Sequence, residues 1–155
     1  MAKVGLTKLE LQKEIPPYEF DWGNGNVIEI KQYLPIQEKL ELISRVINKS
    51  IDEGKFYNPG KVQLFFDLEL AYTYTNINFT EKQKEDFLKT YDLLASNGFF
   101  QSLKGVWMSS SEIDCLKKWL KESLESIYQY NQSVMGILEN VKNNYNELDF
   151  DINNI

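Results

Sequence analysis

Apolar residues recur every seven positions through the last third of the chain, and this repeat constrains the fold more than any other feature. The repeated positions are Ile113, Leu120, Ile127, Val134 and Val141. Such spacing places side chains on one face of an α-helix, and a stripe of this length packs on other helices, either within the fold or in a partner. It predicts one helix over 112–143, roughly 48 Å long. Gly136 would allow a bend or the close approach of another backbone.

The clearest local signal predicts a β-hairpin over 18–31. Residues 18–22 alternate apolar and acidic side chains, and 23–26 read Gly-Asn-Gly-Asn, which tolerates positive φ. The returning segment places Ile28 and Ile30 on one face. Because a lone hairpin is marginally stable in water, this one must lean on helices or join strands of another subunit.

Helical patterns fill most of the chain between these features. The spacing predicts a helix over 36–52, and a second over 61–75, where a strand pattern also fits but the apolar density favours a buried helix. Thr80 and Gln83 have the spacing of a capping box, and Gly98 is placed to end the helix that follows. Residues 106–108 are either a short strand or a plug into the core. The predicted fold is mostly α with a short N-terminal β-hairpin, a helical bundle with one long C-terminal helix.

The 155 residues are enough for one domain with a substantial core. We expect a flexible N-terminal arm over 1–17, a single helical domain over 18–147, and a C-terminal tail over 148–155. No segment has the apolar core of a signal peptide or the ~20 apolar residues of a membrane span. The chain is therefore expected to be a protein of the cytoplasm that makes no contact with a membrane.

The chain contains no histidine and one cysteine, Cys115, and this removes much of the catalytic repertoire. Histidine-dependent nucleophilic systems and the usual zinc sites are impossible, and no phosphate-binding glycine motif is present. The net charge of −6, from 17 basic and 23 acidic residues, argues against nucleic-acid binding because no basic block stands out. We assign no catalytic, cofactor-binding or metal-binding residue and expect a non-enzymatic protein that uses no cofactor.

Two blocks of the sequence resemble a known group of proteins. They are 27–40 (VIEIKQYLPIQEKL) and 72–86 (YTYTNINFTEKQKED), and together they resemble small proteins encoded by tailed phages of Gram-positive bacteria. The layout, a hairpin followed by helices, is similar to the tail assembly chaperones of long-tailed phages, which coat the tape-measure protein before the tail tube forms. The resemblance implies a protein of the host bacterial cytoplasm, or of the finished virion, that binds tape-measure, tail or head proteins.

Protein binding is thus the expected function. The partners are expected to be other phage proteins, and copies of the chain are expected to be able to bind one another as a homo-oligomer. The candidate contact residues come from the hairpin, from the predicted plug and from the long apolar stripe. They are Ile28, Ile30, Trp107, Ile127, Tyr130, Val134 and Val141. The alternative is a small acidic phage inhibitor of a host defence enzyme, although acidic and basic residues alternate too closely for a regular mimic of phosphates.

Overall fold

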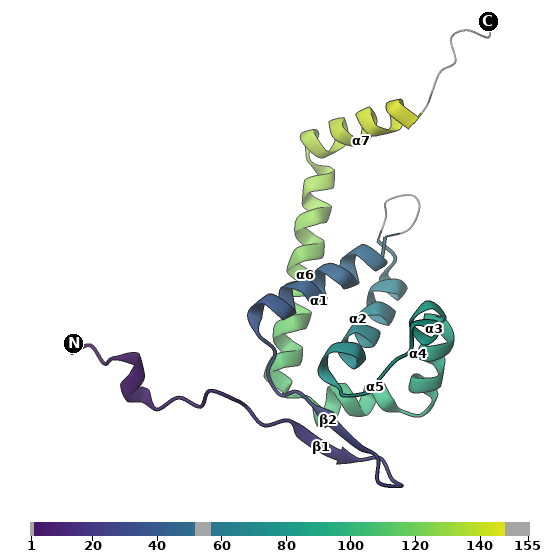
Figure 1. The fold of residues 1–155 in the computed structure, drawn as a ribbon. Coiled ribbons are helices and arrows are strands. Elements are labelled where there is room, and N and C mark those ends of the chain that lie inside the picture. Colours follow the sequence, from purple (N-terminus) through teal and green to yellow (C-terminus); the bar gives the residue numbers. More distant parts are fainter. Residues whose placement is uncertain (1, 52–56, 148–155) are drawn as a thin grey trace, which may run out of the picture. The chain divides into compact units, whose positions relative to one another are not determined.

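The computed structural model describes residues 2–51 and 57–147, and it confirms the predicted fold class (Figure 1). Most of the described chain is helical, and the described strands form one two-stranded antiparallel sheet. The chain divides into two compact units, 1–116 and 117–155. The predicted tail over 148–155 lies outside the described residues.

The hairpin forms where the sequence predicts it. Strand β1 (Tyr18–Asp21) pairs with β2 (Val27–Ile30), and Phe20 lies opposite Ile28. The turn has positive φ at Gly23 (107°), Asn24 (55°) and Gly25 (77°). Glycine and asparagine are the residues that adopt this backbone region readily, so the turn residues themselves set the register.

The outer edge of β2 is paired with the segment that follows helix α2 (Pro59–Tyr74). The Lys31 amide donates to the Tyr74 carbonyl (2.8 Å), and the Asn76 amide donates to the Glu29 carbonyl (3.2 Å). The Asn76 side chain also accepts from the Glu29 amide (3.0 Å). The hairpin is therefore stabilised within its own unit.

Helices α1 (Ile36–Lys49) and α2 lie side by side and supply much of the core of the first unit. Asn58 begins α2, because its Oδ1 accepts from the amides of Gly60 (3.0 Å) and Lys61 (3.3 Å), and Pro59 occupies the first helical position. Buried side chains lie all around α2, and for this reason its sequence fits a strand as well as a helix. The first helix ends at Lys49, so the prediction that it continues through Ser50 and Ile51 is wrong, and residue 52 lies outside the described residues.

The capping box is present, with Thr80 Oγ1 accepting from the Gln83 amide (3.3 Å) and Gln83 Oε1 accepting from the Thr80 amide (2.9 Å). The helix it begins is short, because α3 (Glu81–Glu85) stops at Asp86 and α4 (Phe87–Ser96) starts anew. At this break the Thr90 hydroxyl donates to the Gln83 carbonyl (2.7 Å). Gly98 ends α4 with a φ of 70°, as predicted.

Helix α5 (Phe99–Ser102) and the π-helical turn η2 (Leu103–Trp107) follow Gly98. Trp107 and Met108 are buried, so the predicted plug into the core is confirmed for these two residues, whereas Val106 is exposed. The alternative of a strand is wrong.

The predicted helix over 112–143 is present as two helices, α6 (Ser110–Gln132) and α7 (Val134–Glu147). The break lies at Ser133, whose amide donates to the Tyr130 carbonyl (2.9 Å). A side chain at Gly136 would collide with the Tyr130 carbonyl oxygen, so glycine is required there. The sequence indicated a possible bend at Gly136, and the break lies three residues earlier, at Ser133.

The N-terminal segment contains one short 3₁₀ helix, η1 (Leu6–Leu9). All described side chains from 2 to 17 are exposed.

Candidate protein-binding surfaces

An aromatic cluster fixes the hairpin to the helical part of its unit. Ring centroids of Phe20 and Trp107 are 4.6 Å apart, and those of Trp22 and Trp107 are 6.0 Å apart. Phe99 completes the cluster at 5.4 Å from Trp107. Aromatic pairs at these separations add to the stability that burial alone supplies. Trp107 thus holds the hairpin in place and has almost no surface left for a partner, with an exposed fraction of 4%.

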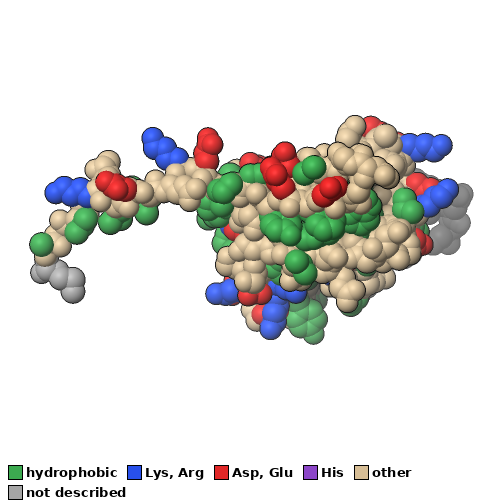
Figure 2. All heavy atoms as spheres, turned by 90° about the horizontal axis from the view of Figure 1, so that it is seen from below, with side chains coloured by type: hydrophobic (Ala, Val, Ile, Leu, Met, Phe, Trp, Pro, Cys, Tyr) green, Lys and Arg blue, Asp and Glu red, His purple; other side chains and the backbone are tan. Residues whose placement is uncertain are grey.

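A groove of about 420 Å³ opens between the hairpin and α4, and we call it the hairpin groove. Its lining residues are Trp22, Asn26, Ile28, Ile77, Leu93, Leu94, Asn97 and Phe99. Leu93 is 63% exposed and Trp22 is 46% exposed, although both border the groove. The hairpin end of the molecule, seen from below in Figure 2, carries a band of hydrophobic side chains with acidic side chains beside it.

Two amide side chains supply the polar groups of the groove. Asn26 Nδ2 donates to the Gly23 carbonyl (3.2 Å), and Asn97 Nδ2 donates to the Leu93 carbonyl (2.8 Å). Apolar walls with a few placed polar groups are typical of binding sites in proteins. The groove can therefore accept an apolar side chain and hydrogen-bond the polar atoms next to it.

Strand β1 has an outer edge that pairs with no other strand of the described residues. The Trp22 amide donates to the Asn26 carbonyl across the turn (2.9 Å). In an antiparallel pair every second residue hydrogen-bonds to the partner strand, so the N–H and C=O groups of Glu19 and Asp21 point to the outer edge. An open edge of this kind can pair with an extended segment of another chain.

Three of the predicted contact residues lie in the first unit. Ile28, Ile30 and Trp107 are all buried in the core, and of these three only Ile28 also lines the hairpin groove. The sequence reasoning missed Leu93, because the helical spacing after Thr80 leaves it off the apolar face. That face consists of Phe87, Leu88, Tyr91, Leu94 and Ala95. In the structure Leu94 is half-buried, as that face predicts, whereas Leu88 is exposed.

The second unit carries the remaining predicted contact residues. Tyr130, Val134 and Val141 are exposed, and Ile127 is half-buried. The Tyr130 hydroxyl donates to Glu139 Oε2 (2.7 Å), and this hydrogen bond raises the Tyr130 pKa. Five exposed apolar side chains of α7 have helical spacing, namely Val134, Met135, Ile137, Leu138 and Val141. We call them the α7 face.

Three buried carboxylates of the first unit are each held by a separate set of cations. Glu69 binds Arg45 and Lys49, Asp67 binds Lys104 Nζ (2.7 Å), and Glu112 binds Lys39 Nζ (2.6 Å). Asp67 and Glu69 do not converge, as their separation of two residues on a helix predicts. Among the described residues no three His, Cys, Asp or Glu side chains are grouped so that they could hold a metal ion.

No helix in the described part of the chain combines the length and apolar character needed to cross a membrane. Comparison with protein-family models, curated protein sequences and solved structures found no match to this chain.

Proposed function

We propose that this protein is a non-enzymatic phage protein that binds other phage proteins during tail or virion assembly, in the manner of a tail assembly chaperone or a minor structural component. The observation that supports protein binding most directly is the hairpin groove, where Trp22 and Leu93 remain exposed beside a cavity of about 420 Å³. The phage context rests on the resemblance of 27–40 and 72–86 alone.

The groove would work by covering an apolar side chain of a partner until assembly places that side chain elsewhere. Full burial of a leucine-sized side chain stabilises by about 1.5–3 kcal/mol. Leu93 and the partner side chain both lose contact with water in such a complex. The acidic surface, with a net charge of −6, keeps the loaded protein from aggregating.

The test is co-expression of the tagged protein with a tape-measure protein of a tailed phage of Gram-positive hosts, followed by affinity capture. Leu93→Asp places a charge at the groove, and Leu88→Asp is the matched control on the same helix. The two leucines are 63% and 58% exposed, but Leu88 does not line the groove. We expect capture by the wild type and by Leu88→Asp, and loss of capture in Leu93→Asp.

If Leu93→Asp captures the tape-measure protein as well as Leu88→Asp and the wild type do, the groove is not the binding site. Capture of a single host enzyme, with no phage protein, would instead favour the alternative of a small acidic inhibitor of a host defence enzyme. Circular dichroism of each variant checks that loss of binding is not loss of folding.

The α7 face is a second surface through which we propose protein contact, including contact with other copies of the chain. Light scattering on a size-exclusion column measures the solution mass of the wild type and of a Val134→Asp, Val141→Asp double variant. A mass above ~18 kDa for the wild type that falls to the monomer value in the variant supports self-association. A wild-type monomer contradicts it.

A further inference from the structure

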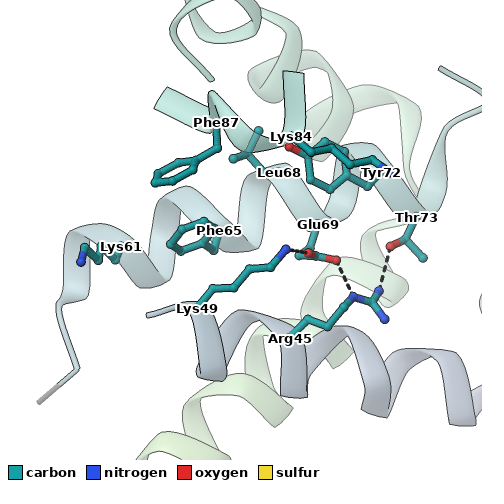
Figure 3. Close-up of a pocket in the computed structure, with 10 residues that line it drawn as sticks. All are labelled: Arg45, Lys49, Lys61, Phe65, Leu68, Glu69, Tyr72, Thr73, Lys84 and Phe87. Atoms are coloured by element: carbon teal, nitrogen blue, oxygen red, sulfur yellow. Dashed lines mark hydrogen bonds and ion pairs between the residues drawn. The ribbon is translucent and has the colours of Figure 1, made fainter. Parts of the chain in front are cut away.

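A second cavity, of about 600 Å³, is lined by residues of α1, α2, α3 and α4 (Figure 3). Its floor is formed by the apolar side chains of Phe65, Leu68 and Phe87 and by the ring of Tyr72. Phe65 and Phe87 meet with their ring centroids 5.0 Å apart. A volume of this size lies within the range of ~300–1,000 Å³ found for binding sites.

The walls of this cavity carry more positive than negative charge, and we call it the basic pocket. Among the described residues that line it, four are basic, Arg45, Lys49, Lys61 and Lys84, and one is acidic, Glu69. The chain as a whole has the opposite balance, with 17 basic and 23 acidic residues. A positively charged rim above an apolar floor is complementary to a ligand that carries both a carboxylate and an apolar group.

Glu69 orients two of the basic side chains at the rim. Its Oε2 is 2.7 Å from Arg45 Nε, and its Oε1 is 2.7 Å from Lys49 Nζ. Figure 3 shows both cations reaching this one carboxylate from α1. One negative charge shared by two cations leaves a net positive charge, and the Arg45 and Lys49 side chains are still 42% and 45% exposed.

Lys84 approaches from α3 and pairs with Glu81 at 3.2 Å. Both side chains of this pair are exposed, so it contributes little and exchanges readily for another anion. A carboxylate bound at the rim would thus meet Arg45 and Lys49 on one helix and Lys84 on another. The apolar floor lies between them.

We propose that the basic pocket binds an acidic peptide segment of a partner protein, with an aromatic or large aliphatic side chain on the floor and a neighbouring Asp or Glu at the rim. The half-exposed cations favour a peptide over a small free metabolite, because a small-molecule site encloses most of its ligand and desolvates the groups that bind it. This inference goes beyond the proposed function, since it concerns a site distinct from the hairpin groove.

The test uses fluorescence anisotropy with the purified full chain and a fluorescein-labelled peptide of sequence Gly-Asp-Phe-Asp-Leu-Asp-Gly. We expect saturable binding that weakens with added NaCl. Replacing Asp by Asn or Phe by Ala in the peptide should each weaken binding. Lys49→Gln and Lys84→Gln should weaken it about tenfold, because each removes one charge-assisted contact.

Matched variants separate the pocket from general charge effects. Lys82→Gln makes the same charge change on α3 at an exposed position outside the pocket, and it should bind as the wild type does. Lys49→Gln leaves Glu69 paired with Arg45, so the variant should remain folded. Leu93→Asp, which tests the hairpin groove, should also leave peptide binding unchanged, so failure of one proposal is distinguishable from failure of the other.

Three results would overturn the proposal. One is the absence of saturation up to about 1 mM protein. Another is equal loss of binding in Lys82→Gln and Lys84→Gln, which would mean charge attraction without a site. The last is displacement of the peptide by 3-phenylpropionate at equal concentration, which would assign the pocket to a small carboxylate.

Discussion

Lys39→Met tests whether the buried ion pair between Lys39 and Glu112 determines the stability of the first unit. The side chains of this pair are 7% and 6% exposed, and Glu112 also accepts from the Leu34 amide (3.1 Å) and the Tyr74 hydroxyl (2.7 Å). Removing one partner of a buried pair generally costs ~3–5 kcal/mol, because the other charge stays buried without compensation. The two neutral donors remain, so we expect a loss of about 3 kcal/mol.

The assay is urea unfolding followed by tryptophan fluorescence, with the free energy of unfolding taken from the midpoint at an unchanged m-value. Lys84→Met is the control, because it removes an exposed pair and should change stability by less than about 0.5 kcal/mol. The double variant Lys39→Met, Glu112→Gln should lose less than the sum of the single variants. A Lys39→Met protein within about 1 kcal/mol of the wild type would refute the reasoning.

Tyr74→Phe should destabilise by about 1.5–3 kcal/mol in the same assay, since it removes a hydrogen bond to a charged group. Tyr72→Phe should be neutral or up to about 1 kcal/mol more stable, because the Tyr72 hydroxyl is buried without a partner among the described residues; a comparable loss in both variants would contradict this. Burial and the neighbouring Glu112 raise the Tyr74 pKa above its ordinary value of 10.0. Just above pH 10 the Tyr74 hydroxyl therefore ionises only in the unfolded state, and the free energy of unfolding should fall there more steeply in the wild type than in Tyr74→Phe. Gly136→Ala should shift the ¹³Cα resonances of 131–136 as the bend changes, whereas Gly105→Ala, with open space around it, should leave them in place.

Local interactions made much of the fold predictable from the sequence. The hairpin follows from glycine and asparagine at positions of positive φ, and the capping box from a three-residue spacing. Gly98 ends a helix for the same conformational reason. Each of these features depends on residues close together in the chain, which is why pattern reasoning reaches them.

The breaks and the binding surfaces depend on contacts that no periodic pattern encodes. The break at Asp86 involves a hydrogen bond from Thr90 to Gln83, seven residues apart. Glu69 and Glu112 look like ordinary surface acids in the sequence, but they pair with lysines from α1, more than 19 residues away. The hairpin groove and the basic pocket are each lined by segments that are distant in the chain. The sequence therefore predicted one lining residue of the groove, Ile28, and none of the basic residues of the pocket.

The unequal edges of the hairpin limit how large an assembly built on it can become. The outer edge of β2 is occupied by 74–76, and only β1 is open among the described strands. If two copies joined through β1, a two-fold axis would close the pair, and both outer edges of the resulting four-stranded sheet would already be covered. Association through this edge therefore ends at a dimer, or at one partner strand, and cannot propagate into a fibre.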